Sequence, residues 1–129
     1  KDVPIQTVKK MYALKTGALI KAACEIGCVL AGADAEKLAA ATLFSEKIGL
    51  AFQVADDILD LIGDSAVLGK PVGSDDKNNK STYVSHYGIE KSKADVIALT
   101  NEAIDALSVF SDDADALREL AQMLTDRKN

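Results

Sequence analysis

Three aspartates lie close together in an otherwise apolar stretch, FQVADDILD, at residues 52–60. If this stretch is helical, Asp56 and Asp60 are four residues apart and Asp57 and Asp60 three, so the carboxylates gather on one or two adjacent faces. Carboxylates set among Ile, Leu, Val and Phe need a compensating positive charge. A small number of oxygen ligands suits Mg²⁺, which keeps several waters and is often shared with substrate phosphates. The triplet is therefore a candidate Mg²⁺ site.

A second interpretation of the triplet is that it marks the solvated end of a buried helix just before Gly63. Anions are unfavourable at the C-terminal end of a helix, and residues that weaken an element locally tend to be kept for a task. The residues alone leave both interpretations open.

Lys15 and Thr16 stand directly before Gly17 in a helical pattern. A glycine inside a helix costs about 1 kcal/mol relative to alanine, so we expect a local break or a close helix approach there. A lysine as a point charge and a threonine as a donor could contact a diphosphate. Taken alone, the pair is more typical of a surface lysine and a helix-capping threonine.

Residues 63–81 are expected to be irregular, because three of the eight glycines, one of the two prolines and three lysines fall there. Such a long connection in a compact domain is uncommon and often functional. Lys70 and Lys80 could reach an anion, although the segment does not match the phosphate-binding pattern G-x-x-x-x-G-K-[ST]. A lid over a charged site and a simple surface connection both fit.

Apolar residues recur at helical spacing along the rest of the chain. A first helical stretch is expected from Pro4 to a stop at Gly32, and a second, buried on more than one side, from a cap at Asp34 to about residue 62. Two more are expected at roughly 89–110 and 113–126, with Ser111 and Asp112 as the capping signals between them. The predicted architecture is an all-α bundle.

Composition excludes several classes of protein. A net charge of −5 argues against a nucleic-acid surface. Neither a signal peptide nor a run of 18 apolar residues is recognised, which predicts a cytoplasmic chain without an integral membrane segment. Cys24 and Cys28, the only cysteines, are predicted to pack in the core and not to bind metal.

Four segments together resemble a known family: KTGALIKAA, GLAFQVADDILD, GDSAVLGKPVGSD and NKSTY. Their order and spacing are similar to those of bacterial farnesyl and geranylgeranyl diphosphate synthases, which are trans-prenyl diphosphate synthases. The resemblance covers nearly the whole chain. It implies the all-α isoprenoid synthase fold, with residues 1–129 as the C-terminal portion of one domain whose N-terminal half is absent. It also implies a homodimer in the full-length protein.

The resemblance assigns the triplet to the family's second aspartate-rich motif. Asp56 and Asp60 are then the expected Mg²⁺ ligands, with Asp57 either ligating or supporting them. Mg²⁺ would join them to the diphosphate of the allylic substrate. Lys15, Lys70 and Asp56 are the residues expected to act in catalysis.

The same resemblance implies a binding site for the diphosphate. Lys15, Lys70 and Lys80 would hold the allylic diphosphate, and Thr16 and Gln53 would add hydrogen bonds. The implied reaction joins the allylic diphosphate head-to-tail with isopentenyl diphosphate after Mg²⁺-assisted ionisation.

Part of that machinery is not in this sequence. The family also needs a first aspartate-rich motif and basic residues for isopentenyl diphosphate, and neither is found. We therefore expect the chain alone to be inactive, and to show an apolar flank where the missing N-terminal half would pack. The alternative is a non-catalytic prenyl synthase-like subunit or interaction module. A terpene cyclase fits the KTG and loop segments less well, and a di-iron bundle fails because His86 stands alone.

Overall fold

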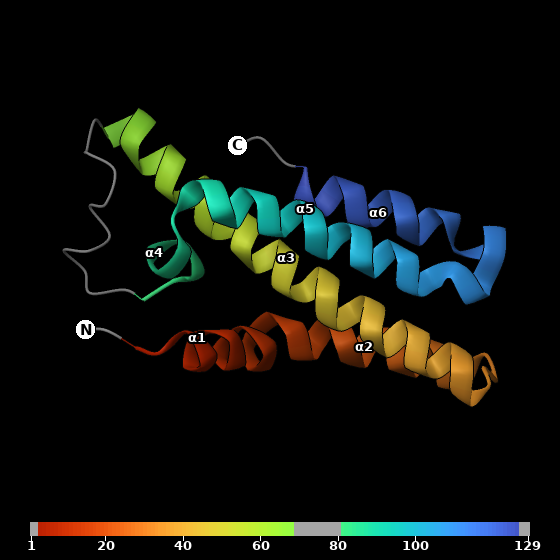
Figure 1. The fold of residues 1–129 in the computed structure, drawn as a ribbon. Coiled ribbons are helices and arrows are strands. Elements are labelled where there is room, and N and C mark those ends of the chain that lie inside the picture. The colour runs from red at the N-terminus through yellow and green to blue at the C-terminus, as the bar shows by residue number, and fades with distance from the viewer. Residues whose placement is uncertain (1–2, 69–80, 127–129) are drawn as a thin grey trace.

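The computed structural model describes residues 3–68 and 81–126, and every regular element in that part of the chain is helical. The predicted all-α fold is confirmed (Figure 1). The elements, in chain order, are α1 (Ile5–Tyr12), a π-helix (Ala13–Gly17), α2 (Ala18–Leu30), α3 (Ala35–Leu68), α4 (Tyr83–Tyr87), α5 (Ile89–Ala106), a 3₁₀-helix (Leu107–Ala114) and α6 (Asp115–Thr125).

The first three elements form one continuous rod. Helical dihedral angles persist through Ala13 and Gly17, so the break predicted at Gly17 is a π-helical turn and not an interruption. Gly17 is also a point of close approach, because a Cβ on Gly49 of α3 would lie 3.3 Å from its Cα. The predicted stop at Gly32 is confirmed by its left-handed φ of 76°, which favours glycine.

Helix α3 begins as predicted and ends later than predicted. Asp34 caps it, since its Oδ1 accepts a hydrogen bond of 2.9 Å from the Lys37 amide. The helix then continues to Leu68, so the irregular segment expected from residue 63 is wrong over its first six residues. A single glycine at position 63 costs only about 1 kcal/mol, which a helix packed along most of its length tolerates.

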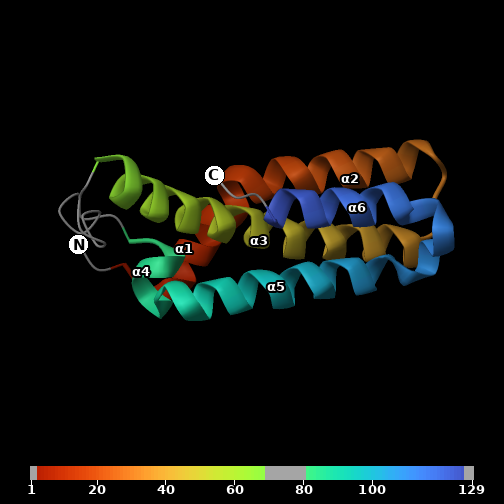
Figure 2. The same ribbon diagram turned by 90° about the horizontal axis from the view of Figure 1, so that it is seen from above.

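Helix α3 is the centre of the molecule, with the α1–α2 rod on one side and α5 on another (Figures 1 and 2). Two apolar clusters share it. The first joins α3 to α1, α4 and α5, and its buried members are Val8, Tyr12, Val54, Ala55, Ile58, Tyr83, Val84 and Val96. The second joins α3 to the C-terminal helices, and its buried members are Phe44, Ile48, Ala103, Leu107, Ala114 and Ala121.

The short helix α4 was not expected from the sequence. Thr82 and Ser85 form a reciprocal capping box at its start, with the Ser85 amide 3.0 Å from the Thr82 hydroxyl oxygen. Gly88, at a φ of 84°, separates α4 from α5. Helix α4 therefore fixes the chain where it returns to the bundle beside α1 (Figure 1).

The predicted break between two helices is confirmed at Ser111, where the backbone leaves helical geometry (φ 47°, ψ −138°), but the predicted side-chain cap is wrong. Helix α6 is preceded by Ala114, and no side chain caps it. The connection is instead held by Arg118, whose guanidinium donates to the carbonyls of Leu107 at 3.0 Å and Ser111 at 2.6 Å. Hydrogen bonds from Arg118 of α6 thus take the place of a local cap.

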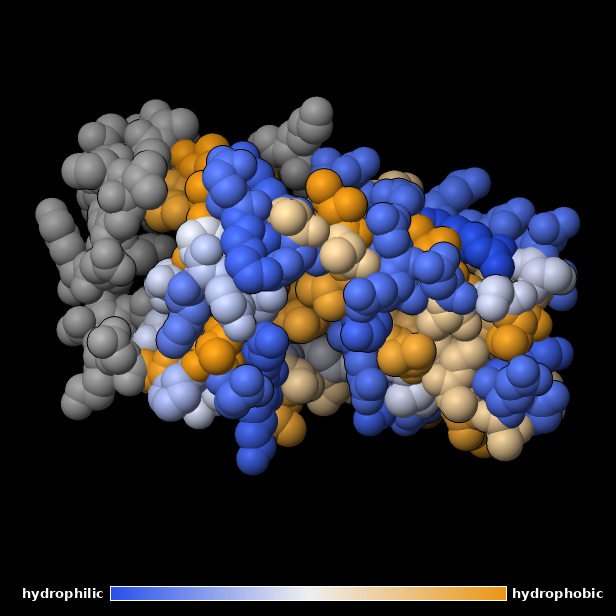
Figure 3. Space-filling model, viewed as in Figure 1, coloured by the Kyte–Doolittle hydropathy of each residue, from blue (hydrophilic) through white to orange (hydrophobic). Residues whose placement is uncertain are grey.

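Apolar side chains reach the surface in several places, interrupted by charged ones (Figure 3). Ile97 on α5 and Met123 on α6 are more than half exposed. Five further side chains that are more than half exposed belong to the rod: Leu14, Leu19, Ile26, Val29 and Leu30. This agrees with the expected apolar flank.

One helical stretch, Ala35–Gly63, is long and apolar enough to cross a membrane by length and composition. Half of its most apolar window is buried against other helices, and the central helix of a bundle meets the same criteria. The stretch is therefore weak evidence for a membrane span.

Candidate functional site

The aspartate triplet lies on α3 beside the first apolar cluster. Asp56 and Asp57 are half-buried and Asp60 is exposed, while Ala55 and Ile58 next to them are buried. The helical spacing expected from the sequence is therefore present, with the three carboxylates at the boundary between core and solvent. That position allows contact with a charged ligand without burying an unpaired charge.

Asp57 is bound by a residue that the sequence analysis did not single out. The Tyr12 hydroxyl at the end of α1 donates to Asp57 Oδ2, and the same hydroxyl accepts a hydrogen bond from the Tyr83 amide at 3.2 Å. The pKa of Asp57 is raised to about 6, mainly because the carboxyl is buried. The hydrogen bond from Tyr12 lowers this pKa, and the nearby charges of Asp60 and Asp56 raise it. Burial also raises the pKa of Tyr12, so the phenol stays protonated and can donate.

Gln53, predicted to hydrogen-bond a diphosphate, is engaged elsewhere in this structure. The residue is 8% exposed, and its Nε2 donates to the Tyr12 backbone carbonyl at 2.6 Å. Gln53 and Asp57 are four residues apart and thus on one face of α3, so that face holds Tyr12 by its carbonyl and by its hydroxyl. A buried Tyr needs a partner for its hydroxyl, and that requirement is the only sequence signal that could have pointed to Tyr12.

Lys15 and Thr16 follow Tyr12 on the π-helical turn, which packs against α3. Lys15 is exposed and Thr16 half-buried. In the described part of the chain, Lys15 makes no ion pair with the triplet. Lys70 and Lys80 lie outside the described residues. The structure therefore brings Tyr12, Gln53 and Asp57 together, and it holds Lys15 and Thr16 on the turn that follows Tyr12.

The residues fit a metal in part. Among the described residues, no group of three or more His, Cys, Asp or Glu side chains converges on a point that could hold a metal ion. The donors at the triplet are all carboxylate oxygens, which suits Mg²⁺, and Mg²⁺ usually takes only one or two protein carboxylates beside water and substrate phosphates. The donor set is thus right for Mg²⁺ held jointly with a diphosphate, and too sparse for a cage made of protein alone.

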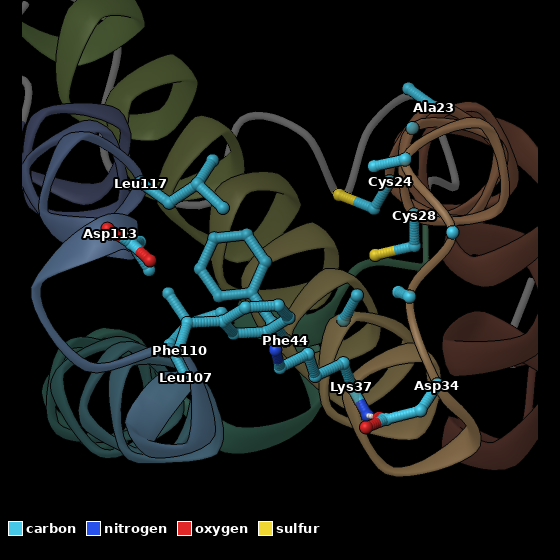
Figure 4. A pocket seen from close by; sticks show the side chains of 16 residues that line it. Ala23, Cys24, Cys28, Asp34, Lys37, Phe44, Leu107, Phe110, Asp113 and Leu117 are labelled. Atoms are coloured by element: carbon cyan, nitrogen blue, oxygen red, sulfur yellow. Dashed lines mark hydrogen bonds between the residues drawn. The ribbon is translucent and has the colours of Figure 1, made fainter.

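A separate cavity of about 650 Å³ lies at the other end of the bundle, between α2, the start of α3, the 3₁₀-helix and α6 (Figure 4). Phe44, Phe110 and Leu117 contribute apolar walls. Cys24 and Cys28 also line it, with both sulfurs directed into the cavity (Figure 4). Both are half-buried free thiols. The prediction that they pack in the core is confirmed for Cys24, which packs against the second apolar cluster, whereas Cys28 borders the hollow.

Residues 1–123 match the family model for polyprenyl synthetases. The chain therefore belongs to the polyprenyl synthetase family, as the resemblance implied. It is 40% identical to the farnesyl diphosphate synthase of Escherichia coli and 37% identical to the geranylgeranyl diphosphate synthase of Cyanophora paradoxa, over 98% and 99% of its own length.

Solved structures agree with this assignment. An FPP/GFPP synthase from Zymomonas mobilis superposes with a TM-score of 0.79 at 32% identity over 96% of this chain. A geranyltransferase from Legionella pneumophila superposes with a TM-score of 0.76 at 27% identity over 98% of it. The chain spans less than half of these relatives, at 44% and 43% of the two curated proteins and 40% and 39% of the two crystallised ones.

Proposed function

We propose that this chain is the C-terminal portion of a Mg²⁺-dependent prenyltransferase that condenses an allylic diphosphate with isopentenyl diphosphate, giving a farnesyl- or geranylgeranyl-type product. The observation that carries the proposal is the position of the triplet. Asp57 is bound to Tyr12, and the next residues along the rod form the π-helical turn with Lys15 and Thr16. Carboxylates for a metal and donors for a phosphate thus stand on two helices that are fastened to each other.

The residues have distinct roles in this proposal. Asp56 and Asp60 would hold Mg²⁺, and Lys15 would stabilise the negative charge that builds on the departing diphosphate. Bound Mg²⁺ would supply Lewis-acid stabilisation of the same oxygens. Lys70, Lys80 and Thr16 would complete the binding site for the diphosphate, as the resemblance implies.

Gln53 has a further part besides the one first expected. Because its amide nitrogen donates to the Tyr12 carbonyl, we assign it to fastening α3 to α1 in this structure. The amide carries a second N–H, so a hydrogen bond from Gln53 to the diphosphate stays part of the proposal.

A steady-state assay with allylic and isopentenyl diphosphates tests the proposal. We expect no turnover by the purified 129-residue chain, because it has neither a first aspartate-rich motif nor a site for isopentenyl diphosphate. Turnover should appear when the chain is extended to the full length of its relatives, and should fall by at least 100-fold in Asp56→Asn of that protein. An extended protein without activity, or an active isolated chain, would contradict the proposal.

The alternative is a non-catalytic subunit of the same fold. Such a subunit has no need of Mg²⁺ and would bind it no better in the presence of a diphosphate. Calorimetry of Mg²⁺ binding with and without inorganic pyrophosphate separates the two. Cytoplasmic location and homodimer formation belong to the same proposal and are tested by fractionation and by sedimentation of the full-length protein.

A further inference from the structure

Tyr12 joins three elements through two of its atoms. Its hydroxyl donates to Asp57 on α3 and accepts from the Tyr83 amide on α4, and its carbonyl accepts from Gln53 on α3. Only 9% of the residue is exposed. These elements meet at one end of the bundle (Figures 1 and 2).

Tyr12 lies between the two parts of the proposed site, the acidic triplet and the turn with Lys15 and Thr16. The acidic triplet is held through Asp57, and the turn carrying Lys15 and Thr16 begins at the residue after Tyr12. A shift of Tyr12 therefore moves one group relative to the other. Hydrogen bonds to residues beside a metal ligand fix its orientation, and losing one costs about 10–100-fold in metal affinity or activity.

We infer that Tyr12 is a positioning residue of the proposed metal and diphosphate site, acting through Asp57. Its hydroxyl fixes the Asp57 carboxylate, and its carbonyl keeps the Lys15–Thr16 turn in register with α3. This inference rests on the proposed function, since it assumes that the triplet serves a metal-bound diphosphate.

Removal of the hydroxyl should leave the fold intact. Lys9 lies 5.8 Å from the centre of the Tyr83 ring, and the Val3 amide donates to Ser81 Oγ at 3.1 Å, so α1 stays joined to the α4 region without it. Tyr12→Phe keeps the ring and the carbonyl bond to Gln53. Tyr87→Phe is a matched control, because it removes a hydroxyl from the neighbouring aromatic pair, whose ring centres are 4.8 Å apart.

The test is a double-mutant cycle on Mg²⁺ affinity in the presence of inorganic pyrophosphate, measured by calorimetry on the 129-residue chain. Tyr12→Phe should weaken binding on the order of 10-fold, and Tyr87→Phe should not. In an Asp57→Asn background, Tyr12→Phe should cause no further loss. An equal loss in both backgrounds, or no loss in either, would overturn the inference.

A second readout does not depend on the metal. The side-chain carboxyl NMR resonance of Asp57 should shift in Tyr12→Phe and stay in place in Tyr87→Phe. If the wild-type chain binds neither Mg²⁺ nor pyrophosphate, the proposed function fails for this chain, and an unmoved Asp57 resonance then rejects the role of Tyr12 separately.

Discussion

Two buried polar side chains, those of Gln53 and Ser92, differ in whether they have a hydrogen-bond partner. Gln53 is buried with its amide bonded, whereas the Ser92 hydroxyl on α5 is fully buried and has no hydrogen-bond partner among the described residues. An unsatisfied buried polar group costs about 1–3 kcal/mol. The two residues therefore differ in what their removal should do.

Ser92→Ala should raise the free energy of unfolding by about 1 kcal/mol, because it removes the unpaired hydroxyl and barely changes the side-chain volume. Chemical denaturation of the chain measures this. Gln53→Ala is the contrasting variant and should destabilise the fold, since it leaves the Tyr12 carbonyl without its partner. A less stable Ser92→Ala chain would show that the hydroxyl is bonded in solution.

Asp57 should make stability depend on pH in metal-free buffer. Its pKa in the fold is about 6, above the 3.8 of an unperturbed aspartate, so folding favours the protonated form. The unfolded chain then binds fewer protons than the folded one between these values, and stability falls as pH rises from about 4 to about 6. Asp57→Asn should flatten this fall, which urea midpoints between pH 4 and pH 7.5 can measure. An identical pH dependence of stability in Asp57→Asn would contradict the raised pKa of Asp57.

At the scale of the elements, Gly49 on α3 lies close to Gly17, the last residue of the π-helix in the rod. A Cβ on Gly49 would lie 3.3 Å from the Gly17 Cα, a backbone atom that a side-chain rotation cannot move away. Gly49→Ala should therefore destabilise the chain despite the better helix propensity of alanine.

The control for this variant is Gly27→Ala on α2. Nothing lies within 4 Å of a Cβ built there, so the substitution should stabilise the chain by about 1 kcal/mol through helix propensity alone. Thermal unfolding of both variants is the measurement. If Gly49→Ala proves as stabilising as Gly27→Ala, the two helices are not in close contact at this point.

The sequence predicted the ends of helices correctly where the residue at the end determines them by itself. Gly32 ends a helix through its own dihedral preference, and Asp34 caps the next through its own side chain. Gly63 is too weak a stop for a well-packed helix, and five-residue α4 is too short to show a helical period. Ser111 marks the break between two helices but caps neither, because Arg118 of α6 holds the connection instead.

The candidate site could likewise be predicted from the sequence only in part. The triplet was evident because three carboxylates in an apolar run are conspicuous in any sequence. The Tyr12 contacts were not, because Tyr12 stands 45 residues from Asp57 and 41 from Gln53, and only the packing of α1 on α3 joins them. Gln53 was assigned to a ligand because its type suits one, and the structure adds a second partner, the Tyr12 carbonyl, which the sequence did not indicate.

At the scale of the whole molecule, the exposed apolar face of the rod is the surface on which the proposed N-terminal half would pack. Leu19 is 74% exposed and Ile26 58%, and faces of this kind usually mark interaction sites. Leu19→Gln combined with Ile26→Gln should reduce hydrophobic dye binding while changing stability by less than about 0.5 kcal/mol per site. In the full-length protein, the same pair should destabilise the fold, because the proposed N-terminal half covers this face. Unchanged stability of the full-length double variant would show that this apolar face is exposed to solvent in the full-length protein.

The central claim is that this chain supplies the metal and allylic-diphosphate side of a prenyltransferase site. The most direct measurement is calorimetry of Mg²⁺ binding to the chain with and without inorganic pyrophosphate, in wild type, Asp56→Asn and Asp105→Asn. Asp105, exposed on α5, is the control for loss of a carboxylate. The account predicts that pyrophosphate strengthens Mg²⁺ binding in wild type and Asp105→Asn, and that Asp56→Asn abolishes this gain. Binding that ignores pyrophosphate, or that survives Asp56→Asn unchanged, would contradict it.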